Sequence, residues 1–157
     1  MQAQSTQVAE RTAAIVDGLK GLEGPLLPIL HGVQEEFGHV PVEALPVIAD
    51  ALNMSNAEVH GVVSFYHDYR REPAGRHVLK ICQAEACQSM GSDGVTARLS
   101  DLLGAGLHET AKDGSVTIEP VYCLGLCACA PAVMLDGQVI GRVDEEAIEE
   151  IAAEVRR

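Results

Sequence analysis

Cysteine spacing gives this 157-residue sequence its clearest chemical signal. All five cysteines lie between positions 82 and 129, and four of them form two close pairs. Cys82 and Cys87 enclose four residues, whereas Cys123 and Cys127 enclose three. A short β-type run precedes each pair. We therefore expect two loops at one end of a sheet, with four thiolates around one inorganic centre.

A [2Fe–2S] cluster suits such a set, because each iron takes two thiolates besides the bridging sulfides. A bound metal centre also offsets the negative charge of four thiolates. Gly125, within the second pair, lets backbone N–H groups approach sulfur without a Cβ in the way. Small residues after that pair would form an apolar cover: Ala128, Ala130, Pro131 and Ala132. The residues thus predict a [2Fe–2S] cluster on Cys82, Cys87, Cys123 and Cys127.

Other uses of these cysteines stay open. Structural zinc also takes four thiolates, although its ligand pairs typically enclose two residues. A redox-active disulfide is less favoured because the chain has no C-x-x-C, and free cysteines can be small buried hydrophobes. Cys129 lies too near Cys127 to be an easy independent ligand. We expect Cys129 to be buried near the site, with a spare-ligand role as the alternative, and Glu85 to face solvent.

Composition limits the partners. The chain has 23 acidic and 11 basic residues, a net charge of −12, and no basic run, so no nucleic acid is expected. No stretch approaches the roughly 20 apolar residues that span a bilayer, so no direct membrane insertion is expected. The first residues lack a signal-peptide pattern, and we expect a cytoplasmic protein. There is no G-x-G-x-x-G and no Walker loop, and we assign no catalytic residue.

Residues 1–72 carry helical patterns throughout. Apolar residues recur at helical spacing near 8–19, 26–37 and 45–52. Gly38 is a C-terminal stop, and Pro41 is interpreted as a first-turn proline. The Ser55–Glu58 capping box begins a fourth helix. This half is predicted to be a helical bundle with short connections.

Residues 73–157 follow a different pattern after a Pro-Ala-Gly-Arg link. Strands are expected at 77–81 and 115–121, with a helix at 92–103 between them. Asp136-Gly137 predicts a hairpin turn between two further strands, and Asp144 would cap a last helix. This order suits an α/β domain with helices on a mixed sheet.

The motifs resemble those of the 24-kDa-type [2Fe–2S] subunit of NADH dehydrogenases, the thioredoxin-like ferredoxins. In the second half Cys82-x4-Cys87, Cys123-Leu-Gly-x-Cys127 and Ala130-Pro131 are similar to its ligand motifs. In the first half the stretches 26–35 and 57–66 resemble that family too. The resemblance implies that the four paired cysteines bind the cluster and that 73–157 has a thioredoxin-like fold. It also implies that 1–72 is a docking extension.

Within that family, Cys82 to Ser89 and the short acidic chain look most like the gamma subunit of soluble NAD-dependent formate dehydrogenase. The complex I subunit often has Glu before its third cysteine, where this chain has Tyr122. The resemblance implies an electron-transfer subunit that exchanges single electrons with the FMN of a partner. It places FMN and NAD on a flavin subunit, and the molybdenum cofactor and further clusters on partner subunits that include a large catalytic subunit. The alternatives are the equivalent subunit of complex I or of an NAD-reducing hydrogenase, or a free-standing ferredoxin.

Overall fold

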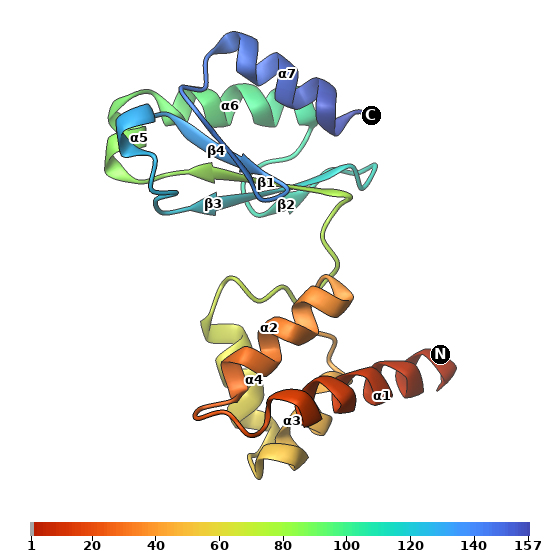
Figure 1. Cartoon of the computed structure of the whole chain (residues 1–157). Helices are drawn as coiled ribbons and strands as arrows, with labels where there is room; N and C mark the ends of the chain where they lie inside the picture. The colour runs from red at the N-terminus through yellow and green to blue at the C-terminus, as the bar shows by residue number, and fades with distance from the viewer. Residues whose placement is uncertain (1) are drawn as a thin grey trace. The chain divides into compact units, whose positions relative to one another are not determined.

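The computed structural model describes residues 2–157, with side chains from residue 5 onward. The chain divides into two compact units, Met1–Pro73 and Ala74–Arg157 (Figure 1). In the part of the chain that the structure describes, no helix is both long enough and apolar enough to cross a membrane.

The first unit consists of helices. These are α1 (Gln2–Leu19), α2 (Leu26–Phe37), α3 (Ala44–Leu52) and α4 (Asn56–Phe65). Their apolar faces meet in an aliphatic core whose most deeply buried side chains include Ile29, Leu30, Val33, Ile48 and Val59. Helical spacing of these residues places them on the inward faces, so the burial of apolar surface stabilises this unit.

The helix ends of the first unit follow local chemistry. Gly38 ends α2 with a left-handed φ of 74°. Ser55 forms the predicted capping box, in which its hydroxyl accepts from the Glu58 N–H and the Glu58 carboxylate accepts from the Ser55 N–H. The interpretation of Pro41 was wrong: its carbonyl accepts the N–H of Ala44 at 3.0 Å in a turn that precedes α3. The helix begins only at Ala44.

The second unit contains a five-stranded sheet in the order β2-β3-β1-β4-β5. The strands are β1 (His77–Cys82), β2 (Glu109–Thr110), β3 (Val116–Val121), β4 (Ala132–Leu135) and β5 (Gln138–Gly141). β1 and β3 are parallel, and the other neighbours are antiparallel. The sheet is therefore mixed, as predicted.

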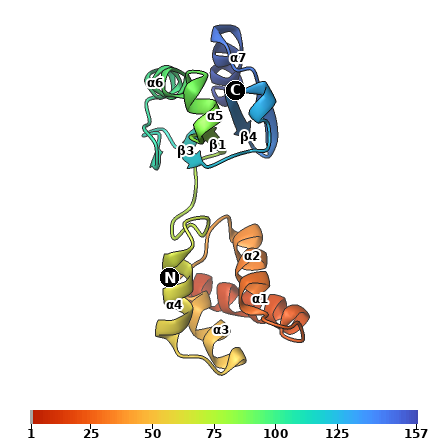
Figure 2. The same cartoon turned by 90° about the vertical axis from the view of Figure 1, so that its left-hand side faces the viewer.

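Helices cover one face of this sheet. α6 (Ser92–Leu103) and α7 (Glu145–Val155) lie side by side on it, while the short α5 (Glu85–Ser89) lies beyond the end of β1 (Figures 1 and 2). Alternate strand residues such as Leu79, Ile81 and Ile118 are fully buried in the core of this unit. The two-residue β2, α5 and a 3₁₀ turn at Cys127–Cys129 were not predicted.

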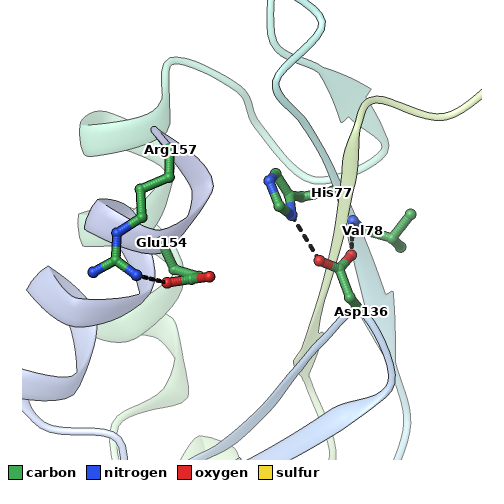
Figure 3. A network of polar contacts seen from close by, with 5 residues as sticks. All are labelled: His77, Val78, Asp136, Glu154 and Arg157. Atoms are coloured by element: carbon green, nitrogen blue, oxygen red, sulfur yellow. Dashed lines mark hydrogen bonds and ion pairs between the residues drawn. The ribbon is translucent and has the colours of Figure 1, made fainter.

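The predicted hairpin joins β4 to β5. Asp136 and Gly137 have φ values of 48° and 87°, as a type I′ turn requires. The Asp136 carboxylate accepts the Val78 N–H at 2.8 Å and lies 2.6 Å from His77 Nδ1 (Figure 3). These contacts fasten the hairpin to the start of β1, the end of that strand opposite to Cys82.

Candidate metal centre

Sheet topology brings the two cysteine loops to one edge. β1 ends at Cys82, whose neighbour across the parallel ladder is Val121, the last residue of β3. Because parallel strands end at the same edge, the loop that carries Cys123 begins beside Cys82. β4 is antiparallel to β1 and begins at this same edge with Ala132. Three chain segments therefore meet where the sequence predicted a site.

The four paired cysteines form two thiol pairs in contact with each other. Cys123 Sγ and Cys127 Sγ are 3.6 Å apart, and Cys82 and Cys87 share a side-chain hydrogen bond. Backbone N–H groups of Cys123 and Leu124 donate to the Cys82 sulfur, which joins one pair to the other. The structure thus places all four predicted ligands together.

Local backbone conformation aims N–H groups at sulfur. Cys123 has a φ of 96°, a region that residues other than glycine rarely adopt. Gly125, with a φ of 78°, donates its N–H to Cys123 Sγ at 3.4 Å. Strain of this kind persists where the surroundings hold it, and it concentrates at functional sites. Here it turns the loop so that the Gly125 N–H faces the Cys123 sulfur, while the N–H groups of Cys123 and Leu124 face the Cys82 sulfur.

The thiols of the first pair differ in acidity. Burial raises the pKa of the Cys82 thiol, but N–H donors from Ala84, Cys123 and Leu124 and a hydrogen bond with Cys87 outweigh it and leave this pKa lowered. Burial and the hydrogen bond with Cys82 raise the pKa of Cys87. Cys82 is therefore the sulfur prepared to be a thiolate, with Cys87 as its donor.

In the second pair, the hydrogen bond with Cys123 and the charge of that residue raise the pKa of Cys127. Metal binding to either pair must displace protons, because only the thiolate is a ligand.

The two cysteine pairs differ in solvent exposure. Cys82 and Cys87 are 2% exposed and pack with Ala132, whereas Cys123 and Cys127 are exposed. Glu85 faces solvent, as predicted. Two expectations were wrong: Cys129 is only half-buried, and Ala128 is exposed and covers nothing. The 3₁₀ turn that begins at Cys127 turns these side chains outward, and the predicted apolar cover is limited to the residues after it.

A binuclear centre fits this arrangement. The two thiol pairs match a centre in which each of two irons takes two thiolates. The N–H donors to Cys82 and Cys123 match the negative charge that bound thiolates keep.

Comparison with known proteins decides the family. The model of the thioredoxin-like [2Fe–2S] ferredoxin family matches residues 12–156. This chain belongs to that family. Its cofactor is a [2Fe–2S] cluster, its role is electron transfer, and the expected thioredoxin-like fold is confirmed.

The curated relatives of this ferredoxin-family chain are components of larger complexes. HndA, a subunit of the NADP-reducing hydrogenase of Solidesulfovibrio fructosivorans, is 34% identical over 88% of this chain and 81% of its own length. The NADH-quinone oxidoreductase of Pseudomonas aeruginosa has a subunit that is 37% identical over 76% of this chain and 72% of its own length. The corresponding protein of Escherichia coli K12 gives the same values.

Among solved structures, an NAD⁺-reducing [NiFe]-hydrogenase in the air-oxidized state matches 83% of this chain with a TM-score of 0.72 and 21% identity. The match covers 22% of that hydrogenase chain. At this identity the likeness supports the fold alone.

Sequence reasoning missed polar residues that contact the backbone and neighbours of Cys82. Ser92 is fully buried, and its hydroxyl donates to the carbonyl of Cys82 at 2.5 Å. Gln83 contacts both Ser92 and Thr96. A polar residue at the start of a helix is typical of an ordinary cap in a sequence, so no pattern distinguished Ser92.

Proposed function

We propose that this chain is the [2Fe–2S] electron-transfer subunit of an NAD-linked oxidoreductase complex, with Cys82, Cys87, Cys123 and Cys127 as the cluster ligands. The convergence of four thiols from two loops at one sheet edge carries this proposal. Relatives that are named as hydrogenase and NADH-quinone oxidoreductase subunits support it.

The cluster accepts and releases one electron at a time, whereas NAD exchanges two. In this proposal the FMN and the NAD site belong to a partner subunit, as the family resemblance implies. This chain contributes four ligands and N–H groups that hold negative sulfur. Its exposed pair, Cys123 and Cys127, faces the partner, because the buried pair has no access to solvent.

Exposed apolar residues next to the site support that orientation. Tyr122 precedes Cys123 and is 75% exposed, and Met90, after α5, is 62% exposed. The first unit is proposed as the docking extension, and its own exposed residues include Val42 and Phe65, at 70% and 73%. Large exposed apolar side chains are typical of surfaces that bind other proteins.

At a finer level we propose that the parent complex is an NAD-dependent formate dehydrogenase with a large molybdenum and iron–sulfur subunit. The stretch from Cys82 to Ser89 supports this, as does Tyr122 at the position where complex I subunits often have Glu. An NAD(P)-reducing hydrogenase is the second candidate, supported by the 34% identity with HndA.

Serine substitutions test the ligand set. Each of Cys82→Ser, Cys87→Ser, Cys123→Ser and Cys127→Ser should abolish or change the visible absorption and the reduced-state paramagnetic signal of the anaerobically prepared chain. Cys129→Ser is the matched control and should keep both. Unchanged signals in any of the four would remove that residue from the ligand set.

Purification of the intact complex tests the parent enzyme. A co-purifying large subunit that contains molybdenum and oxidises formate supports the formate dehydrogenase. A co-purifying hydrogenase or a quinone-linked assembly contradicts it, and elution as a small free protein contradicts the subunit role.

A further inference from the structure

A polar network that includes the buried Ser92 and the half-buried Gln83 and Thr96 lies next to Cys82. We propose that Gln83 and Ser92 are positioning residues for the cluster, acting through the carbonyl of Cys82 and through both ligand loops. This inference rests on the proposed function, since it takes Cys82 to be a ligand. We call Gln83, Ser92, Thr96 and the Cys82 carbonyl the Gln83–Ser92 network.

The hydroxyl of Ser92 is the inner end of this network. Ser92 is 0% exposed and its Oγ lies 2.5 Å from the Cys82 carbonyl oxygen, to which it donates. Ser92 is the first residue of α6. The bond therefore joins a cluster ligand to the helix that packs on the sheet. A buried hydroxyl that is fully used in this way fixes the position of its acceptor.

Gln83 connects the network to both cysteine loops. Its N–H donates to the Val121 carbonyl at 2.8 Å, at the start of the loop that carries Cys123. Its carbonyl accepts the side-chain amide of Gln88, next to Cys87, at 2.9 Å. Its own side-chain amide donates to Thr96 Oγ1 at 3.0 Å and, at a longer 3.5 Å, to Ser92 Oγ. One residue thus contacts both cysteine-bearing segments and the start of α6.

The hydrogen bonds of the two hydroxyl groups explain why position 83 carries an amide side chain. The single hydroxyl hydrogen of Ser92 is used on Cys82, and that of Thr96 is used on the Ser92 carbonyl at 2.8 Å. Both hydroxyl oxygens can therefore only accept from Gln83, and an NH₂ group supplies the two donors. A carboxylate at this position would face two acceptors and would turn a hydroxyl away from its present partner.

The network should also affect the reduction potential. The Ser92 hydroxyl offsets the negative end of the Cys82 carbonyl dipole beside the cluster, and negative charge near a cluster favours its oxidised state. Without the hydroxyl the midpoint potential should fall. A role limited to holding the fold would change stability and leave the potential where it is.

The test uses the full chain, prepared anaerobically with its cluster. Ser92→Ala should lower the midpoint potential, shift the g values of the reduced cluster, and speed cluster loss to an iron chelator about tenfold, the effect of one lost buried hydrogen bond. Ser89→Ala is the matched control, because that exposed hydroxyl donates to the Ala86 carbonyl at 2.9 Å within α5. It should change none of the three.

Charge at position 83 gives a second measurement. Gln83→Glu should lower the midpoint potential more than Gln138→Glu, which places the same charge at the exposed end of β5. If Ser92→Ala or Gln83→Glu fails to hold a cluster, Thr96→Val, which leaves the Ser92–Cys82 bond in place, should still shift the g values.

Potentials and g values that equal those of the controls in every cluster-bearing variant would overturn the inference. A Cys82→Ser variant with unchanged absorption and an unchanged paramagnetic signal would instead overturn the ligand assignment, so the two failures can be told apart.

Discussion

The two units of this chain are held together in different ways. The first unit has a mainly aliphatic core in which Tyr69 is also buried, with a glycine C-cap on α2 and a capping box on α4. The second has a similar core under α6 and α7, and at one sheet edge it has a separate small cluster in which Cys82, Cys87 and Ala132 are buried. That edge combines sulfur and N–H groups with small and aliphatic side chains. The contrast is therefore between one aliphatic core and a similar core with a sulfur-containing cluster beside it.

Core truncation gives the largest test of this contrast. Ile48→Ala in the first unit and Ile81→Ala in the second each remove a fully buried side chain and should cost about 2–5 kcal/mol. Ile81 precedes Cys82, so its truncation should also loosen the cluster, whereas Ile48→Ala should leave the visible spectrum unchanged. Chemical denaturation followed by far-UV dichroism and cluster absorbance measures both. An equal loss of absorbance in the two variants would contradict independent units.

Close backbone packing near the thiols gives the next effect. A Cβ added to Gly141 would lie 2.8 Å from Cys129 Cβ and 2.9 Å from its carbonyl oxygen. Gly141→Ala should therefore displace the turn after Cys127 and cost about 1–3 kcal/mol. Gly94→Ala in α6 meets no atom within 4 Å and should stabilise by about 0.5–1 kcal/mol. Thermal melts measure the stability of both variants. A destabilised Gly94→Ala would contradict the absence of contacts around a Cβ at that position.

Two buried hydroxyls sharpen the comparison. Ser92 in the second unit donates to Cys82, whereas Thr12 in α1 is fully buried and its Oγ1 has no hydrogen-bond partner. Thr12→Val should therefore stabilise the first unit by about 1 kcal/mol, because an unsatisfied buried polar group is costly. Urea unfolding of the variant measures the change. A loss of stability would mean that the Thr12 hydroxyl makes a stabilising hydrogen bond, as the Ser92 hydroxyl does.

Acid should have the smallest effect, through the Glu58 capping box in the first unit and the Asp113 turn before β3 in the second. Backbone and side-chain hydrogen bonds with Ser55 lower the pKa of Glu58, and hydrogen bonds with Ser115 lower the pKa of Asp113. A carboxyl whose folded pKa is lowered stabilises above its unfolded pKa and loses that contribution as pH falls through the folded value. Glu58→Gln and Asp113→Asn should therefore flatten the stability profile below about pH 4. An unchanged slope in both would argue against these bonds.

Sequence reasoning reached the elements because local signals were strong. The Ser55–Glu58 box, Gly38 and Asp136-Gly137 each specify a backbone conformation, and the structure contains all three. It also anticipated that the two cysteine loops share a sheet edge, since parallel strands on either side of a helix end together.

The remaining features depend on three-dimensional contacts that have no sequence period. β2 is two residues long and pairs only because β3 offers it an edge. The positive φ of Cys123, the outward turn at Ala128 and the use of Ser92 arise from how loops meet, and no neighbouring residue indicates them.

The short distance between Cys123 and Cys127 has a practical consequence. Their sulfur atoms, 3.6 Å apart and open to solvent, need to approach only to about 2 Å to form a disulfide once metal is gone and dioxygen takes up the two electrons. Such a bond would remove two of the four proposed ligands at once. Air would then convert the metal-free protein into a disulfide form that cannot bind the cluster. A thiol reductant would have to reduce this disulfide before a cluster could be inserted again.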